Sequence, residues 1–150
     1  MNPDEIHPEA AVAPGYLANH AARVFNRTVD ARLREHGLTL ALIGPLLLLN
    51  WKGSMLQRDL VQASAIKQPA MVALLDKLEA MAMITREVLP TDKRAATVRL
   101  TDAGSAAART GGQILHAVND LGVAGFTDEE AATFIGFLGR LIGNLENPSP

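Results

Sequence analysis

The sequence predicts a mainly α-helical protein with one small β-hairpin, and two observations support this prediction. Apolar residues recur every three or four positions along most of the chain, which is the period of an amphipathic helix. Between residues 84 and 100 the period changes to two, around a polar loop that contains a proline. This change is typical of two short strands joined by a turn.

The composition indicates one folded domain. The chain has 150 residues, of which 48% are hydrophobic and 20% are charged, and this balance supports a sizeable core. The absence of cysteine excludes disulfides and thiol chemistry. The longest apolar run, residues 38–49, is broken by Gly44 and Pro45 and is too short to span a bilayer. The N-terminus has no signal-peptide pattern, so we expect a soluble, cytoplasmic protein.

The first two helices are predicted from periodicity and end signals. Residues 1–14 contain three prolines and are expected to form a flexible arm. From Tyr16 a helical period leads to Gly37, which follows basic residues and suits the left-handed end of a helix. Thr39 is a plausible N-cap for a second helix that extends to about Asn50. Because this helix is apolar on nearly all sides, we expect it to be buried at the centre.

The middle of the chain predicts a helix-turn-helix followed by the hairpin. The expected order is short helix, turn, longer helix, strand, loop and strand, at about residues 56–63, 64–66, 68–81, 84–88, 89–95 and 96–100. This order defines a winged helix-turn-helix, in which the hairpin is the wing. We place this winged helix-turn-helix, a type of domain that binds DNA, at residues 37–104.

The C-terminal part predicts two long helices. Thr101 or Asp102 can cap a helix that extends to about Leu121, and residues 127–130 form a capping box for the last helix. Each glycine inside the last helix lowers helix stability by about 1 kcal/mol relative to alanine. Their presence suggests that another helix approaches closely. One chain of this size has few other surfaces to cover the apolar stripe beside them, so we expect a dimer interface. The stripe consists of Phe134, Ile135, Leu138, Leu141, Ile142 and Leu145.

The charge is unevenly distributed. The whole chain has a net charge of −2, from 14 basic and 16 acidic residues. Residues 52–99 hold eight basic and five acidic side chains, a balance of +3, so the remainder carries −5. A basic middle between acidic ends suits a module that presents one surface to a polyanion.

An ordered set of short motifs resembles the MarR family of bacterial transcription regulators, over about residues 17–146. The resemblance implies a homodimer whose helical ends, residues 15–36 and 105–150, intertwine as a dimerisation region. It also implies that the wing and the longer helix of the helix-turn-helix face double-stranded DNA with a palindromic operator, often under the control of a small ligand. The motifs are GLT (37–39), LDKLE (75–79), DKR (92–94) and LTDAG (100–104).

The start of the longer helix is expected to reach base edges in the major groove. There Gln68 can offer a paired donor and acceptor to adenine, and Lys67 can reach a phosphate or a guanine. Ala70 lies on the same first turn of this helix. Lys52, Gln57 and Arg58 are candidates for contacts to the DNA backbone.

The wing carries the residues that match the family best. Arg94 matches the arginine that enters the minor groove in this family. Asp92 can hold the Arg94 guanidinium through a charge-assisted hydrogen bond, and Lys93 can contact a phosphate. The sequence departs from the family at residues 70–73, which are small or apolar where the family often has threonine or serine and then arginine. We therefore expect few direct contacts between this helix and the bases.

Three aromatic side chains resemble a ligand pocket of the family. Tyr16, His20 and Trp51 lie on the first two predicted helices, and in this family such a neighbourhood accepts aromatic carboxylates and other phenolic compounds. An imidazole could pair with a carboxylate and an indole could stack on a ring. The alternative is that His20 is a core histidine bonded to a backbone carbonyl and that Trp51 simply packs.

Other classes of function lack a pattern in the sequence. No arrangement of carboxylates, nucleophiles or glycine-rich loops suggests an enzyme, and the four histidines are too scattered to suggest a metal site or a cofactor. We therefore expect a dimeric, sequence-specific DNA-binding regulator. It is expected in the bacterial cytoplasm and, when bound to DNA, at the nucleoid. The resemblance implies repression, which is the commoner mode of action in the family. The alternative is a winged-helix protein that acts through protein contacts or ligand binding without specific DNA binding.

Overall fold

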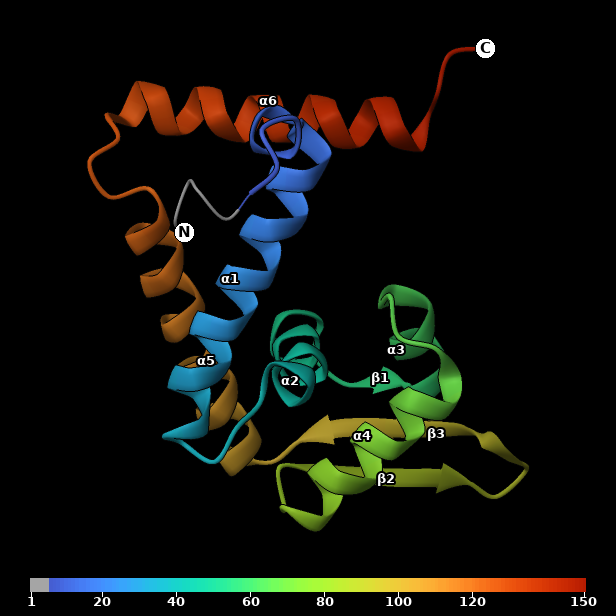
Figure 1. The fold of residues 1–150 in the computed structure, drawn as a ribbon. Coiled ribbons are helices and arrows are strands. Elements are labelled where there is room, and N and C mark those ends of the chain that lie inside the picture. The colour runs from blue at the N-terminus through green and yellow to red at the C-terminus, as the bar shows by residue number, and fades with distance from the viewer. Residues whose placement is uncertain (1–5) are drawn as a thin grey trace. The chain divides into compact units, whose positions relative to one another are not determined.

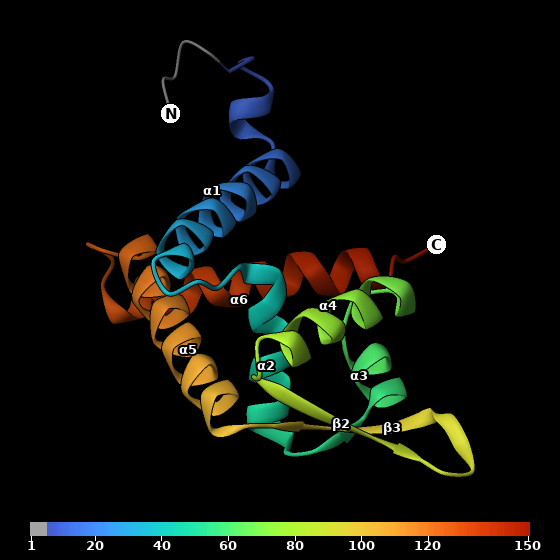
Figure 2. The ribbon, with the colours of Figure 1, turned by 90° about the horizontal axis from the view of Figure 1, so that it is seen from below.

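The computed structural model describes residues 6–150, apart from the side chains of Lys93 and Arg94. This part of the chain is mainly helical with a small antiparallel sheet, as the sequence predicts (Figures 1 and 2). The elements in chain order are η2 (Ala10–Val12, a 3-10 helix), α1 (Pro14–Arg34), α2 (Leu40–Lys52), β1 (Met55–Leu56), α3 (Gln57–Ala63), α4 (Gln68–Ala80), β2 (Ile84–Leu89), β3 (Asp92–Leu100), α5 (Asp102–Gly122) and α6 (Asp128–Glu146).

The first helix begins two residues earlier than expected. Pro14 is its first residue, and the fixed backbone angle and missing N–H of proline suit that position. The short helix η2 lies within the segment predicted to be a flexible arm, whose residues 1–5 lie outside the described residues. The chain leaves α1 through Gly37, which has the expected left-handed backbone (φ 71°).

α2 lies at the centre of the core, as its apolar sequence predicts. Its N-cap is Thr39, whose Oγ1 accepts a hydrogen bond from the amide of Leu42 at 3.3 Å. Asp30 of α1 accepts a second hydrogen bond, from the amide of Leu40 at 2.9 Å, and so ties α1 to the start of α2. Buried side chains from α1, α3, α4, α5, β2 and β3 surround α2 in the core: Val29, Leu33, Leu60, Met71, Leu75, Leu78, Ile84, Val98, Ala107, Ala108 and Val118.

The sheet has one strand more than the sequence predicts. Its order is β1-β3-β2, with antiparallel neighbours. β1 has only two residues, which is too short to show a period of two. Met55 pairs with Val98 and Leu56 pairs with Thr97, so the sheet joins the start of α3 to the wing.

The loop of the wing is shorter than predicted. The polar character of residues 89–95 and their proline predict a loop, but β3 already begins at Asp92. Only Pro90 and Thr91 lie between the strands. The DKR motif therefore belongs to a strand rather than to a loop.

A bulge in β3 accompanies this short turn. Glu87 faces Thr97, but Leu89 faces Asp92, so residues 93–96 of β3 lie opposite a single residue of β2. Extra residues on one strand break the alternation of side chains between the two faces of a sheet. Two consecutive alanines within the bulge are accordingly both buried.

The start of α5 is locked to the turn between α4 and β2 through a close backbone approach. A Cβ built on Gly104 would lie 1.9 Å from the carbonyl oxygen of Met83, so only glycine fits. The amide of Thr101 donates to the same carbonyl at 3.0 Å. The hydroxyl of Thr101 donates to the carbonyl of Ala82 at 2.6 Å and accepts from the amide of Gly104 at 3.1 Å.

The chain divides into two compact units, one up to Val118 and one from Asn119 onward. The first holds the winged helix-turn-helix, α1 and most of α5. The second holds the end of α5 and α6. The predicted capping box opens α6: the amide of Glu130 donates to the hydroxyl of Thr127 at 3.1 Å, and the amide of Thr127 donates to the carboxylate of Glu130 at 2.9 Å.

Candidate nucleic-acid interface

α4 has one buried face and one exposed face. The exposed first turn carries Gln68 and Ala70, preceded by the exposed N-cap residue Lys67. These three predicted residues therefore lie together at the start of the helix. The opposite face packs into the core through Met71, Leu75 and Leu78.

A hollow of about 400 Å³ brings the helix-turn-helix and the wing together. The side of α3, the start of α4 and the start of β3 all contribute to its lining. Four residues predicted from the sequence, Gln57, Arg58, Gln68 and Asp92, meet there. The lining residues are Gln57, Arg58, Val61, Gln62, Gln68 and Asp92.

Gln62 is a lining residue that the sequence reasoning missed. It lies four residues after Arg58 on α3, a spacing that places two side chains on the same face of a helix. That spacing is the signal that identifies it. The hollow thus presents three glutamine amides, one guanidinium and the carboxylate of Asp92. The amides and the guanidinium can donate hydrogen bonds to polar groups of DNA.

The other two wing residues lie beside Asp92 in β3. The backbone of Lys93 and Arg94 belongs to the bulged part of the strand. Their side chains lie outside the part of the structure that is described, so the expected ion pair between Asp92 and Arg94 stays a prediction.

Lys52 does not line this hollow. It is the last residue of α2, and its Nζ lies 5.2 Å from the centre of the Trp51 ring. This distance is within the range of a cation–π interaction. A contact of Lys52 with the DNA backbone stays a prediction.

Trp51 lies at a second, largely apolar cleft of about 470 Å³. The indole is 78% exposed, which is unusual for so large an apolar side chain. The walls come from α2, from the end of α3 with the segment that follows it, and from α4. The lining residues are Gly44, Pro45, Leu47, Leu48, Trp51, Ala63, Ser64, Ala65, Ile66 and Met71.

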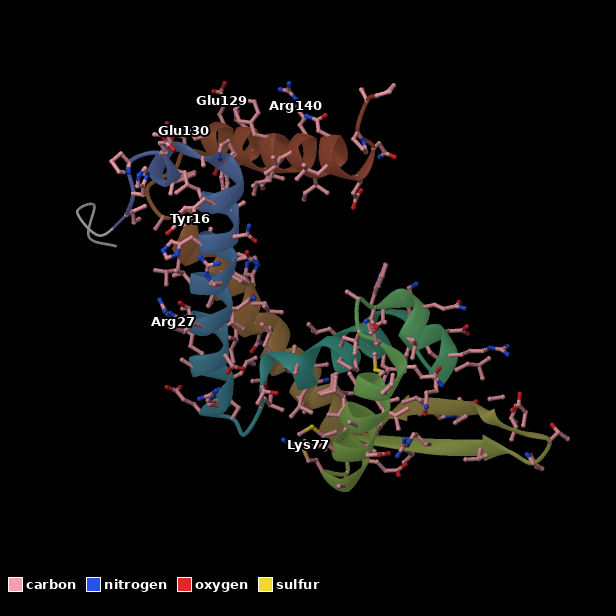
Figure 3. The ribbon with its side chains drawn as sticks, turned by 45° about the vertical axis from the view of Figure 1, so that its right-hand side comes forward. Tyr16, Arg27, Lys77, Glu129, Glu130 and Arg140 are labelled. Atoms are coloured by element: carbon pink, nitrogen blue, oxygen red, sulfur yellow. The ribbon has the colours of Figure 1, made fainter. Side chains whose placement is uncertain are left out.

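The structure does not bring Tyr16 and His20 to the Trp51 cleft. Both residues lie in the first half of α1, which extends away from α2 (Figures 1 and 3). Their rings are stacked on each other, with centres 6.2 Å apart and an interplanar angle of 10°. Within one chain, the three residues expected to form one ligand pocket therefore belong to two separate places.

An ion-pair network that the sequence reasoning also missed connects the wing to α4. Arg86 of β2 donates through Nη2 to a carboxylate oxygen of Asp76 and to Oε1 of Glu79 at 3.1 Å, and through Nε to Oε2 of Glu79 at 3.3 Å. Hydrogen bonds from Arg86 hold the pKa of Glu79 below its ordinary value. The hydrogen bond to Glu79 in turn raises the pKa of Arg86. Because the folded-state pKa of Glu79 is lowered, this pair stabilises the fold above the unfolded-state pKa, and the contribution is lost as the pH falls through the folded-state value.

α6 presents the predicted apolar stripe without burying it. No residue of the helix is buried; Leu138 and Leu141 are half-buried, and the other four stripe residues are exposed. Phe137, which was not predicted, is exposed as well. Among the described residues, nothing lies within 4 Å of a Cβ built on the three glycines beside the stripe, Gly136, Gly139 and Gly143.

The described residues show neither a metal cluster nor a membrane span. No group of three or more histidine and carboxylate side chains among residues 6–150 is placed to hold a metal ion. In the same part of the chain, no helix combines the length and apolar character needed to cross a membrane.

Solved structures similar to this chain are transcriptional regulators. The regulator PA3341 is 30% identical, with a TM-score of 0.73 over 89% of this chain and 98% of its own. A mutant of Escherichia coli MarR, in complex with operator DNA, is 21% identical, with a TM-score of 0.76 over 91% and 99%. Bordetella bronchiseptica BpsR, whose DNA binding is regulated by 6-hydroxynicotinic acid, is 22% identical, with a TM-score of 0.76 over 85% and 96%. No protein-family model matches the chain.

The fold and the sequence identity to PA3341 together define a winged helix-turn-helix transcriptional regulator. The chain belongs to the MarR family, of which a transcriptional regulator from Silicibacter pomeroyi is 26% identical, with a TM-score of 0.71 over 90% of this chain and 91% of its own.

Proposed function

We propose that this protein is a homodimeric, sequence-specific DNA-binding repressor whose binding to DNA is relieved by a small ligand. The observation that supports this most is the hollow at which Arg58 of α3, Gln68 of α4 and Asp92 of the wing meet. Three elements that a winged helix-turn-helix uses to contact DNA thus share one polar surface. The operator complex of the similar E. coli protein supports the same use of this fold.

Each part of this surface has a role that follows from its chemistry. The start of α4 enters the major groove, where Gln68 forms paired hydrogen bonds with an adenine. Arg94 enters the minor groove, where a narrow groove concentrates negative potential. The remaining cations neutralise phosphates and set the orientation of the protein on the duplex: Lys52, Arg58, Lys67 and Lys93.

The dimer follows from α6. Exposed phenylalanine, isoleucine and leucine side chains on one helix form an apolar face that a monomer in water leaves uncovered. Gly136, Gly139 and Gly143 leave open space beside this face, into which a helix of a second chain can pack. A twofold dimer carries two DNA-binding surfaces, so its operator is a palindrome. Such a dimer on a promoter blocks transcription, which makes repression the proposed outcome.

The proposal is tested by selection of duplexes from a random-sequence DNA pool with the purified protein. We expect enrichment of an inverted repeat whose half-sites lie about 10 base pairs apart, the spacing that a twofold dimer of recognition helices requires. The recovered duplex is then used to measure affinity by fluorescence anisotropy. A pool that shows no enriched sequence after repeated rounds would contradict sequence-specific binding.

Affinity for the selected duplex should fall steeply with salt. Because residues 70–73 offer little direct base readout, phosphate neutralisation carries most of the binding. With about eight phosphate contacts per dimer, four from each chain, the affinity should fall about ten-thousandfold between 50 and 200 mM salt. One mismatched base pair should cost less than about tenfold, at the low end of the usual range. A shallow salt dependence combined with sharp discrimination between sequences would argue against this mode of recognition.

The apolar cleft beside Trp51 is the proposed site of the ligand. Its walls include Met71 of α4, so a molecule bound in the cleft contacts the helix that is proposed to read DNA. The exposed indole offers a face on which an aromatic ring stacks, and the Lys52 ammonium beside it offers a partner for a carboxylate. A small phenolic or aromatic carboxylate suits this combination.

Trp51 makes this site directly measurable, since the chain contains a single tryptophan. We expect 4-hydroxybenzoate to quench its fluorescence saturably and to release the selected duplex over the same concentration range. Cyclohexanecarboxylate, which carries the charge without the aromatic ring, is the control and should bind more weakly. Release of DNA without any change in tryptophan emission would place the ligand elsewhere, with the stacked pair Tyr16 and His20 the next candidate.

A second function is favoured by the exposed face of α4. Ala70 and Ala73 are exposed there, and alanine contributes little to base readout. A winged-helix protein that acts through protein contacts, without specific DNA binding, accounts for this surface as well. The selection experiment separates the two functions, because only the first enriches a sequence.

A further inference from the structure

Arg86 joins the two elements that are proposed to contact DNA. It lies within β2 of the wing, and its guanidinium bonds to two carboxylates of α4. The Arg86 side chain is 17% exposed, whereas those of Asp76 and Glu79 are 60% and 44% exposed. The arginine is therefore largely covered between the wing and the helix, and the two carboxylates lie at the outer side of the contact.

The geometry of this contact constrains the orientation of the Arg86 guanidinium as well as its distance from the carboxylates of α4. Nε and Nη2 of Arg86 bond to the two oxygens of Glu79, the bidentate arrangement that the planar guanidinium favours. Nη2 also bonds to Asp76, which lies three residues before Glu79 on the same face of α4. Two neighbouring carboxylates repel each other unless a cation lies between them, so the network favours one placement of β2 against α4.

We propose that Arg86 is a positioning residue for DNA binding, which holds α4 and the wing at a fixed spacing so that both engage one duplex. This inference rests on the proposed function. The major groove contacted by α4 and the minor groove contacted by the wing are neighbours on the duplex, so a change in their relative placement costs one of the two contacts. Arg86 itself does not read DNA, because its guanidinium is turned toward α4.

The first test removes the arginine. We expect Arg86→Gln to lower the affinity for the selected duplex by about tenfold or more, and Arg86→Lys, which keeps the charge but loses the bidentate geometry, to fall between this variant and the wild type. Arg99→Gln is the matched control, because Arg99 is an exposed arginine on the neighbouring strand β3. It should change the affinity by no more than about twofold. Thermal melting of each variant checks the fold.

The second test removes the carboxylates of Asp76 and Glu79. Electrostatics and positioning predict opposite effects of this change on the affinity for DNA. Asp76→Asn combined with Glu79→Gln removes two negative charges from the DNA-binding domain, which by electrostatics alone raises the affinity for DNA. Positioning predicts the opposite, a loss of about tenfold or more. This variant also keeps the proposal testable if Arg86→Gln does not fold.

A double-mutant cycle with Arg94→Ala separates positioning from general stability. Arg94→Ala should cost much less affinity in the Arg86→Gln background than in the wild type, because a wing that is no longer held contributes little. A purely structural role of Arg86 leaves the two losses additive.

The outcomes distinguish the inference from the function on which it rests. The positioning role alone would be overturned if the variants of Arg86, or of Asp76 and Glu79, bound the selected duplex like the wild type. Strictly additive losses of affinity in the double-mutant cycle would overturn it as well. A wild-type protein that selects no duplex refutes the proposed function and this inference with it.

Discussion

Arg94→Ala should weaken binding to the selected duplex by about a hundredfold. The reason is that each wing loses the cation that enters the minor groove, where a narrow groove concentrates negative potential. A loss of about 1.4 kcal/mol per wing, doubled in a dimer with two wings, corresponds to this factor. Fluorescence anisotropy at a fixed salt concentration measures the change.

Lys77→Ala is the control for the loss of charge. Lys77 lies in the last turn of α4, far from the tip of the hairpin (Figure 3). Its removal takes away the same unit charge from the same domain, and we expect a loss of no more than about threefold, the size of a distant electrostatic effect. Equal losses from the two substitutions would mean that general electrostatics, and not the wing, determines binding.

Gly104→Ala should destabilise the fold by about 3 kcal/mol or more. The new Cβ meets the carbonyl oxygen of Met83 at 1.9 Å, and this oxygen also accepts the hydrogen bond from the amide of Thr101. Neither backbone segment can move without loss of that bond, and overpacking of this kind typically costs about 1–3 kcal/mol or more. Urea denaturation at a fixed protein concentration measures the free energy of unfolding.

Gly112→Ala, in the same helix, is the matched control. A Cβ at Gly112 finds only Leu47 Cδ2 at 3.7 Å, an ordinary van der Waals distance. Because alanine is the better helix former by about 1 kcal/mol, this substitution should leave stability unchanged or raise it. Destabilisation of similar size by both substitutions would show that the approach to Met83 is not the cause.

The elements with long periodic sequences were predicted well. The continuous apolar run of α2 indicated its central burial, and Thr39, Gly37 and the capping box at residues 127–130 marked helix ends that the structure confirms. These features are local, since each depends on residues within a few positions of one another. Local signals of this kind are what a single sequence carries most directly.

The features that were missed depend on residues distant in the sequence. β1 has two residues and exists only because β3 pairs with it. The bulge at residues 93–96 falls where the sequence predicts a loop, because a loop and an exposed strand edge have similar polar sequences and only the pairing separates them.

The candidate site was predicted in part. The spacing of the motifs identified Arg58, Gln68 and Asp92 one by one, and the structure brings them to one hollow. The partners of Arg86 lie seven and ten residues before it on another element, so no spacing rule connects them. The expected ligand pocket joined Tyr16 and His20 with Trp51 because this neighbourhood resembles a ligand pocket of the family, but the direction of α1 separates them within one chain.

The central claim is that α3, the start of α4 and the wing form one DNA-binding surface, and an amide NMR titration with the selected duplex tests it most directly. We predict that the largest shifts occur at residues 57–62, 67–73 and 88–97 and that they share one stoichiometry, one duplex per two chains. Residues 128–146 should change little. Shifts concentrated in α6, or binding of the duplex that leaves residues 57–73 and the wing unchanged, would contradict the account.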